Sequence, residues 1–545
     1  MLVLVLIAAC AGSDHAAVHP EFDPTSKAAL PAVNAIHLAP PPLLPATDDI
    51  LAALGSGGYP VDGLERVADG IRPVTVQDGV KEIYVRSGGA FLWFDGGELN
   101  RAGRDVVAIM DTCEDHGLQT RTVKVPLVSN LLEALAWNKR MLLKRQVGAK
   151  DYMGLVRLRG LIMAQLDNQL TGTALTLARM LQQTTLSGVH LADALPDLNE
   201  LSEWVDGLLP WHPQYRRLMG ALVRYRRYVR DGGFPKVVLP EGYDELVEEV
   251  RSDTVVTLRE RLGLEGFLSG PPAGHEDAID SVLQQDVRVF QYSRGLAGTG
   301  LVDKETVDAL NVPADDLVEQ VQQAMKAWRS SPTRAEHTFV QVNLPEYMVE
   351  LYHFRERLQR SRSVIGYSYG TGGGRTKTYH SSVNEIVINP GWSPSESIIR
   401  NEIMAKERRD KGYMARKGFQ WVTRRDGARG LYQRPGPQNA LGSVVMRFRN
   451  PNNIYLHGSP DRDQFAKVKR AWSHGCVRVQ DIEALAFEVL DFNDLLTSRQ
   501  FKEQLAAGKT IRHKLTTPVP IHFEYILTVV DDDDTVRFLP NVYRL

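Results

Sequence analysis

The stretch SHGCVRVQDIEALAFEVL, residues 473–490, places a cysteine directly before a predicted helix. Its second half carries apolar residues at i, i+3, i+4, i+7 and i+8, namely Ile482, Leu485, Ala486, Val489 and Leu490. This stripe predicts an amphipathic helix in QDIEALAFEVLDF, with Asp481 as its N-cap. Cys476 therefore lies just upstream of a helix N-terminus. The helix field there favours a thiolate, although the effect falls off beyond the first turn.

Two histidines accompany Cys476. His474 lies two residues before it, and His457 ends an earlier strand-like segment, NIYLHG. A free thiol, with a pKa of about 8.5, is mostly protonated at neutral pH, so a nucleophilic cysteine needs an adjacent base or imidazolium. Gly475 allows a sharp backbone turn, and the amides near Cys476 can point at a developing oxyanion. The pattern indicates a cysteine nucleophile.

A zinc site is the alternative use of two histidines and a cysteine. Zinc needs three or four ligands, and no CxxC or HxxxH companion lies near this segment. The chain has 3 cysteines, an odd count that rules out a fully paired disulfide framework. Cys113 lies on the apolar face of VVAIMDTCEDHGL and is interpreted as a core residue. We therefore favour cysteine–histidine catalysis, with no metal ion and no cofactor.

Bulk properties limit the remaining function classes. The chain has 545 residues, which suggests about three domains. A net charge of -2 provides no basic field for binding nucleic acid. No apolar run reaches the ~20 residues that a membrane-spanning helix needs. We expect a soluble, multidomain α+β protein.

The N-terminus predicts export. Residues 1–9 form a short apolar signal segment that stops at Cys10, and the Ala- and Pro-rich residues 10–47 are typical of a linker. The ending Ile7-Ala8-Ala9-Cys10 also resembles a lipobox, in which the cysteine is lipidated. No Lys or Arg precedes the apolar run. Lipidation at Cys10 and simple cleavage both remain open.

The middle of the chain predicts two helical regions. Residues 48–250 are interpreted as a helical scaffold, in which a helix from Tyr215 to Arg230 buries Leu218, Leu222, Tyr225 and Val229. Its arginines form a solvated face or contact an anionic polymer, and we favour the solvated face. Residues 251–330 predict a small three-helix module and a connecting helix, with Asp303 as an N-cap. Its second helix is expected to bury Val282, Leu283, Val287, Val289 and Phe290.

Residues 335–530 predict a mainly-β domain. HTFVQVNL and YMVELYHF read as two strands with a tight turn, and SRSVIGYSYG, SSVNEIVIN, SVVMRFRN and NIYLHG are further strands. Residues 394–437 interrupt them with a charged helical segment and loop. Such an insertion is either an active-site lid or a surface decoration. Residues 531–545, which begin with an acidic run, predict a C-terminal hairpin and tail.

These motifs together resemble the L,D-transpeptidase family, whose catalytic unit is the YkuD domain. The resemblance rests on HG followed by SHGCVRV, and extends to VIG, INPGW, RPGPQNALG and PVPIHFEYILTVV. Residues 253–312 resemble the three-helix peptidoglycan-binding module, for which a structural spacer is the alternative. The order of parts is similar to that of the large periplasmic members. The resemblance thus implies a periplasmic enzyme of the cell wall, whose partners are peptidoglycan stem peptides.

The resemblance implies a role for each part of the motif. Cys476 attacks the carbonyl between the third and fourth residues of a tetrapeptide stem, D-alanine leaves, and a second stem's amine resolves the thioester into a 3→3 cross-link. His457 is the general base, oriented by the carbonyl of Gly458. His474, Gly475 and Cys476 frame the oxyanion site.

Four further residues are assigned to substrate binding around this centre. Ser473 holds the loop geometry, and Arg478 binds a substrate carboxylate or braces the loop. Tyr455 and Trp392 shape the cleft or belong to the core. Arg478 departs from the Asn that many members carry two positions after the cysteine. Water or a protein amine as acyl acceptor, and a non-enzymatic wall-binding scaffold, remain the alternatives. We expect a monomer.

Overall fold

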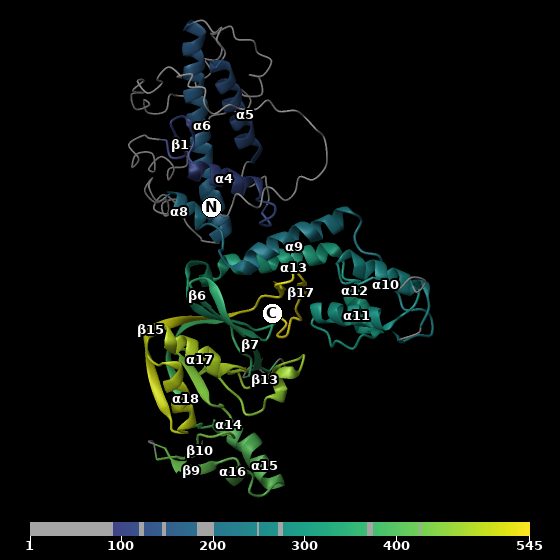
Figure 1. Ribbon diagram of the computed structural model, residues 1–545, viewed down its shortest axis with the longest axis vertical. Coiled ribbons are helices and arrows are strands. Elements are labelled where there is room, and N and C mark those ends of the chain that lie inside the picture. Colours follow the sequence, from purple (N-terminus) through teal and green to yellow (C-terminus); the bar gives the residue numbers. More distant parts are fainter. Residues whose placement is uncertain are drawn as a thin grey trace.

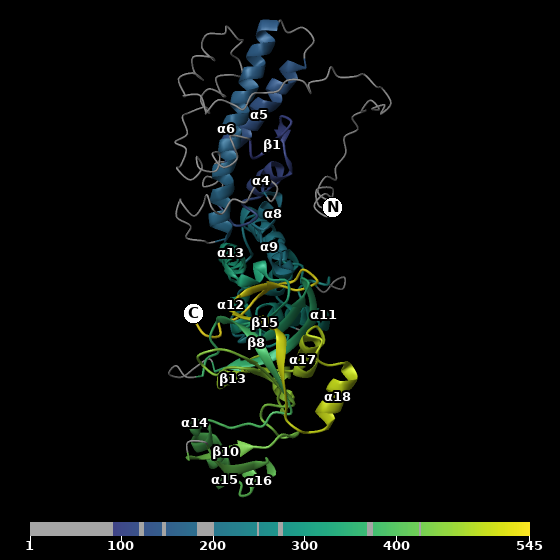
Figure 2. The ribbon, with the colours of Figure 1, turned by 90° about the vertical axis from the view of Figure 1, so that its left-hand side faces the viewer.

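The computed structural model describes residues 91–118, 125–143, 149–182, 201–247, 250–270, 276–367, 374–424 and 427–545. The predicted signal segment, the linker and Cys10 lie outside these described residues. The described parts form an elongated molecule, with the N-terminal helices at one end and the C-terminal sheet domain towards the other (Figures 1 and 2). Within the described ranges, no helix combines the length and the apolar character needed to cross a membrane.

The N-terminal end is mainly helical. Its elements are a short hairpin of β1 (Phe94–Asp95) and β2 (Glu98–Leu99), followed by α4 (Arg101–Asp111), α5 (Val125–Leu142), α6 (Ala149–Gln182) and α8 (Leu201–Asp206). These helices share one apolar core, in which Cys113 is completely buried. Burial raises the pKa of the Cys113 thiol, which keeps it protonated. The interpretation of Cys113 as a core residue is therefore confirmed.

Two long helices join this end to the rest of the chain. α9 (Pro213–Arg230) and α13 (Ala314–Ser330) pack through one core, which also takes in the hairpin of β16 (Thr528–Val530) and β17 (Val536–Phe538). The acidic run lies in the turn of that hairpin, whose first strand begins at Thr528 and so precedes the predicted bounds of 531–545. Asp532 forms ion pairs with Arg217 of α9, at 2.8 Å, and with Arg357, at 2.6 Å. The α9 arginines are thus not all solvated, because Arg217 binds the hairpin.

His212 lies at the centre of this junction. It is completely buried, stacks on Trp328 with 3.9 Å between ring centroids, and accepts a hydrogen bond from the Gln214 amide at the start of α9. Burial, reinforced by Arg357 and Arg217, lowers the pKa of His212 to about 3. The folded protein therefore holds this ring neutral.

We predict that His212 makes the protein acid-sensitive. In the unfolded chain the His212 ring has a pKa of about 6.5, whereas in the folded chain its pKa is about 3. Between these two values the unfolded chain binds a proton that the folded chain does not, so the free energy of unfolding falls as the pH falls. Between pH 7 and pH 5 the loss is about 2 kcal/mol. His212→Asn keeps a capping side chain but removes the titration. Scanning calorimetry should show a pH 7 to 5 decrease in melting temperature about 2–4 °C smaller than in wild type.

The exposed His337 provides the control for this prediction. His337→Asn should keep the full acid shift of the wild type. An undiminished shift in His212→Asn would contradict the assignment.

The small module contains three helices, as predicted: α10 (Asp253–Leu264), α11 (Ser281–Ser293) and α12 (Lys304–Leu310). A two-residue pairing of β3 (Glu245–Leu246) with β4 (Val302–Asp303) closes it. Asp303 caps α12 by accepting from the Thr306 amide at 2.8 Å. The predicted buried face of α11 is partly wrong: Leu283, Val287 and Phe290 are buried, but Val282 and Val289 are 39% and 40% exposed. Those two residues lie beside the i, i+4, i+7 stripe and face solvent.

The C-terminal domain is built on one nine-stranded sheet of the described residues, ordered β13-β7-β14-β12-β11-β8-β15-β5-β6, in which β6 also pairs with β7. The strands are β5 (Phe339–Asn343), β6 (Met348–His353), β7 (Glu356–Gly366), β8 (Tyr379–Ile388), β11 (Val444–Phe448), β12 (Leu456–His457), β13 (Ala471–Ser473), β14 (Val477–Val479) and β15 (Ile511–Glu524). Because β6 pairs at both of its edges, the sheet curls around a continuous apolar core. The predicted multidomain α+β fold, with a mainly-β domain, is confirmed.

Helices α17 (Ile482–Asp491) and α18 (Ser498–Ala506) pack on this sheet. Every residue of the predicted α17 stripe is buried in the sheet core. Asp481 stands at the N-cap position but forms no capping hydrogen bond. Its carboxylate instead accepts from the Ser361 hydroxyl at 3.2 Å, so that part of the prediction is wrong.

The lid, residues 394–437, lies between β8 and β11. It contains α14 (Glu396–Ile398), the π-helix η4 (Ile399–Ile403), α15 (Met404–Arg409), α16 (Tyr413–Arg416), β9 (Phe419–Thr423) and β10 (Arg429–Gln433). The predicted helical part is present, but much of the predicted loop is a β-hairpin of β9 and β10. Both views place these elements at the end of the molecule farthest from α5 and α6 (Figures 1 and 2).

Candidate active site

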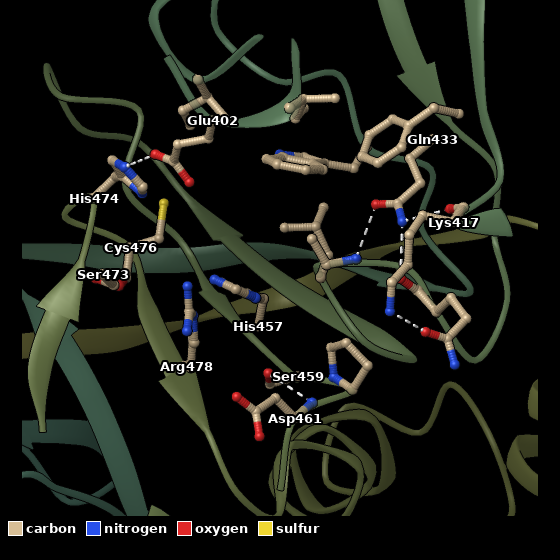
Figure 3. Close-up of a pocket in the computed structure, with 18 of the residues that line it drawn as sticks. Glu402, Lys417, Gln433, His457, Ser459, Asp461, Ser473, His474, Cys476 and Arg478 are labelled. Carbon is tan, nitrogen blue, oxygen red and sulfur yellow. Dashed lines mark hydrogen bonds and ion pairs between the residues drawn. The ribbon is translucent and has the colours of Figure 1, made fainter. Parts of the chain in front are cut away.

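Two short neighbouring strands position the cysteine and histidine. β12 and β14 pair in parallel, with Leu456 opposite Val477 and His457 opposite Arg478. Leu456 and Val477 point into the sheet core. Because side chains alternate along a strand, the residues on either side point to the opposite face. All four of these residues, Tyr455, His457, Cys476 and Arg478, line one cavity of ≈ 330 Å³. Figure 3 labels His457, Cys476 and Arg478 in this cavity.

The lid forms the facing wall of this cavity, and is therefore more than a surface decoration. The lid contributes Ile398 from α14, Glu402 and Ile403 from the π-helix η4, and Lys406 from α15. The base of the lid is closed by two backbone hydrogen bonds between Trp392 and Gln433, of 3.0 and 2.7 Å. Trp392 also lines the cavity and packs with Tyr455 against one small apolar cluster. Trp392 and Tyr455 thus both shape the cleft.

The Cys476 thiol is neutral in the resting site. Burial raises the pKa of this thiol, while hydrogen bonding to Tyr455 and the charge of Arg478 act in the opposite direction without cancelling the effect. The side chain is half-buried, with its Sγ 3.8 Å from the carbonyl oxygen of Asn453. The field of α17 therefore does not make Cys476 a preformed thiolate, and a base must take its proton.

His457 is held neutral and oriented. Its Nδ1 lies 2.7 Å from the carbonyl oxygen of Gly458, the contact that the resemblance implies. Burial, followed by the charge of Arg478, lowers the pKa of His457 to about 3. With its proton on Nδ1, the ring presents Nε2 as a proton acceptor.

The two groups are not in contact in the resting geometry. Across the described part of the chain, no hydrogen bond joins the Cys476 thiol to the His457 ring. In Figure 3 the thiol points towards Glu402 and His474, and the His457 ring lies on the other side of it. Proton transfer therefore requires the thiol to rotate towards His457. Catalytic hydrogen bonds often tighten only when substrate is bound.

The hydroxyl of Ser473 braces the nucleophile loop, residues 473–476. Ser473 is buried, donates to the carbonyl oxygen of Cys476 at 2.5 Å and accepts from the amide of Gly475 at 3.2 Å. Gly475 has φ +114°, a conformation that other residues rarely adopt. Among the described residues, the amide of Cys476 has no acceptor, which leaves it available for an oxyanion. Ser473 thus holds the loop rather than presenting its hydroxyl to a ligand.

Thr376 is a supporting residue that the sequence analysis missed. Its hydroxyl donates to the carbonyl oxygen of Gly475 at 2.8 Å and accepts from the Gly366 amide at 2.9 Å. The hydroxyl of Tyr543, near the end of the chain, accepts from the Thr376 amide and donates to Gly366. No local pattern marks either residue, because their partners are distant in sequence.

We predict that Thr376→Val loosens the nucleophile loop. Valine has nearly the same shape but leaves a buried carbonyl and a buried amide without a partner, which costs about 1–3 kcal/mol each. The initial rate of covalent labelling of Cys476 by iodoacetamide should change at least about threefold, and catalytic turnover should fall by roughly tenfold. Thr378→Val, at an exposed position nearby, is the matched control and should behave as wild type. Identical labelling and turnover in both variants would contradict the role of Thr376.

Arg478 acts on the site through its position and its charge. It donates to the side-chain oxygen of Gln464 at 2.6 Å, which supports a bracing role, and it also lines the cavity. Burial lowers the pKa of Arg478, partly opposed by Asp461. Its charge favours a thiolate at Cys476 and a neutral ring at His457. Bracing and binding of a substrate carboxylate are compatible in this geometry.

His474 contacts the lid. Its Nε2 lies 2.5 Å from Oε1 of Glu402 and 3.3 Å from the hydroxyl of Tyr367 (Figure 3). Glu402 was also missed by the sequence analysis, because nothing in the charged lid helix singles it out.

In the described ranges, no group of three or more His, Cys, Asp or Glu side chains is arranged to hold a metal ion.

Family models match three separate parts of the chain. The "L,D-transpeptidase catalytic domain" matches residues 337–521, the "Scaffold domain" matches residues 78–222, and the "Putative peptidoglycan binding domain" matches residues 251–310. These ranges contain, in turn, the cavity with Cys476, the N-terminal helices, and the three-helix module.

A curated protein of Haemophilus influenzae, described as "Putative L,D-transpeptidase", is 24% identical over 274 residues. The alignment covers 47% of this chain and 55% of that protein, so the chain spans about half the length of the curated relative. Among solved structures, the L,D-transpeptidase of Xylanimonas cellulosilytica is 16% identical, covers 52% of this chain and 100% of its own, and has a TM-score of 0.17. The avibactam carbamoyl enzyme of Ldtfm is 13% identical, with 45% and 83% coverage and a TM-score of 0.18.

With TM-scores this low, the assignment rests on the family models and the curated relative. The protein carries an L,D-transpeptidase catalytic domain of the YkuD family. This domain is joined to a scaffold domain and a peptidoglycan-binding-type module.

Proposed function

We propose that this protein is an L,D-transpeptidase that forms 3→3 cross-links between peptidoglycan stem peptides. One observation carries the proposal: Cys476 and neutral His457 line a single lidded cavity of ≈ 330 Å³, and among the described residues the amide of Cys476 has no hydrogen-bond acceptor. This arrangement suits acyl transfer, because it offers a nucleophile, a base and an oxyanion donor in one enclosed space. The peptidoglycan-binding-type module supports the wall as the place of action.

The acylation step follows from these groups. The thiol of Cys476 gives its proton to Nε2 of His457 as Sγ attacks the carbonyl between the third and fourth residues of a tetrapeptide stem. The oxyanion forms beside the amide of Cys476. The C–N bond then breaks, D-alanine leaves with the proton from His457, and a thioester remains on Cys476.

Deacylation reverses the roles. The side-chain amine of a second stem attacks the thioester carbonyl and gives a proton to His457. The C–S bond breaks, the new amide joins the two stems, and His457 returns the proton to the thiolate of Cys476. The carbonyl of Gly458 keeps the ring in the same tautomer throughout.

Other acceptors use the same acyl-enzyme. Water would make the protein an L,D-carboxypeptidase, and an amine from another protein would attach that protein to the wall. A non-enzymatic wall-binding scaffold would need none of the cavity chemistry, so the shared cavity of Cys476 and His457 favours an enzyme over it.

The cellular setting belongs to the same proposal. The N-terminal segment supports export to the periplasm, with a lipid anchor at Cys10 as one form of the mature protein. We also expect a carbapenem to acylate the thiol of Cys476, because its strained carbonyl resembles an activated donor.

The decisive experiment supplies the full chain with purified disaccharide-tetrapeptides and follows the products by mass spectrometry. The proposal predicts cross-linked dimers together with free D-alanine. Tripeptide monomers without dimers would identify water as the acceptor and a carboxypeptidase. Unchanged tetrapeptide, from a folded protein whose thiol still reacts with iodoacetamide, would contradict the proposal.

A further inference from the structure

Glu402 links the lid to the nucleophile loop. Its Oε1 lies 2.5 Å from Nε2 of His474, and among the described residues this is the one ion pair between the lid and residues 473–476 (Figure 3). The two side chains are 39% and 40% exposed, so the contact lies at the mouth of the cavity. Glu396, earlier in the lid, points elsewhere and pairs with Arg400 and Arg424.

Glu402 lies on the face of the lid helices that lines the cavity. Glu402 lies in the π-helix η4, a rare form that is frequently found at functional sites. In a regular α-helix, Ile398, Glu402 and Lys406 would share one face at intervals of four. The wider π turn also brings Ile403 to the cavity, five residues after Ile398. The lid thus presents Glu402 beside Ile403, a buried apolar side chain that also lines the cavity.

The contact with Glu402 constrains His474, which lies two residues before Cys476. A carboxylate at Nε2 fixes the proton of His474 on that nitrogen and sets the plane of the ring, as a carboxylate does for other functional histidines. Tyr367 packs edge-on against the same ring, with centroids 5.2 Å apart. On its other side the loop is held by Thr376. Glu402 therefore supplies the support that depends on the position of the lid.

The geometry points to Glu402 as a positioning residue of the lid, which acts on Cys476 through His474. When the lid is closed, the Glu402–His474 contact aligns the nucleophile loop and shields the thiol; when it opens, both effects are lost. An exposed contact of this kind is weak, so each effect should be roughly two- to fivefold. A contact of that strength suits a lid that must open in every turnover. The inference refines the proposed acyl transfer, but its first test does not depend on it.

The first test measures thiol reactivity without any substrate. The rate of alkylation of Cys476 by iodoacetamide should rise roughly two- to fivefold in Glu402→Gln, because the lid no longer shields the thiol. Glu402→Asp, which keeps the charge, should recover part of the protection. Glu396→Gln, a matched loss of charge in the same lid, should label at the wild-type rate. In the double variant with His474→Gln, the loss of Glu402 should add nothing further.

The second test separates positioning from substrate binding. For release of D-alanine from the tetrapeptide donor, Glu402→Gln should lower kcat roughly two- to fivefold, with KM within about twofold of wild type. Unchanged alkylation, or additive effects of the two substitutions, would overturn the inference. A change in KM alone would instead make Glu402 a substrate contact. If wild type releases no D-alanine while the alkylation pattern holds, the proposed function fails and the positioning role survives.

Discussion

Cys476→Ala should abolish both D-alanine release and dimer formation, with a loss of at least about 10⁴-fold. The reason is covalent: without Sγ no thioester forms, and neither His457 nor the amide at position 476 can replace it. Because Cys476 is half-buried and neutral, its removal should leave the melting temperature almost unchanged. Product analysis by mass spectrometry, beside a thermal melt, measures both quantities.

Cys113 gives the matched control for this variant. It is the other free cysteine among the described residues, and it is completely buried in the N-terminal core. Cys113→Ala should cost on the order of 1 kcal/mol of stability and leave turnover intact. Dimers formed by Cys476→Ala at the wild-type rate would eliminate Cys476 as the nucleophile.

His457→Gln should change the pH dependence of acylation as well as its rate. In wild type the ring is neutral above a pKa of about 3, and the pKa of the Cys476 thiol is raised, so the neutral pair reacts at all intermediate pH values. Single-turnover release of D-alanine should then be nearly flat from pH 5 to pH 8. Without the base only the small thiolate fraction reacts, so the variant should gain about tenfold per pH unit. At pH 7 the loss should be about 10²- to 10⁴-fold.

The wild-type profile alone discriminates between two resting states. A rate that rises through a pKa near 6.5 would show that the His457 ring titrates at its ordinary pKa and is protonated in the resting site below that pH. The same pH dependence of D-alanine release in wild type and in His457→Gln would show that His457 is not the base in this reaction. A thermal melt of the variant, followed by circular dichroism, distinguishes a loss of activity from a loss of folding.

The sequence predicts those parts of the site that depend on local pattern. The α17 stripe follows from five apolar residues at helical spacing, and all five are buried. The contact of His457 with Gly458 follows from the family resemblance, because it joins adjacent residues. The β9–β10 hairpin could also have been predicted from the sequence, because FQWVT and GLYQ flank an Asp-Gly pair, which is typical of hairpin turns.

The supporting contacts could not be predicted in the same way. Thr376 meets Gly475 across 99 positions, and Tyr543 meets Gly366 across 177, so their pairing depends on the complete sheet. Glu402 is one of several acidic side chains in a charged segment, and its contact with His474 depends on how the lid lies over the sheet. β12 has only two residues, too few to show the alternation that places His457 beside Cys476. The pKa shifts likewise depend on burial that no local pattern encodes.

The most direct test of the account is to find the acyl group on the enzyme. Full-length protein is mixed with a tetrapeptide donor in the absence of acceptor, quenched in acid within the first turnover, digested, and mapped by mass spectrometry. We expect the peptide containing Cys476 to gain the mass of the donor less D-alanine, and hydroxylamine to remove this mass. An unmodified Cys476 peptide during active turnover, or an adduct on another residue, would contradict it.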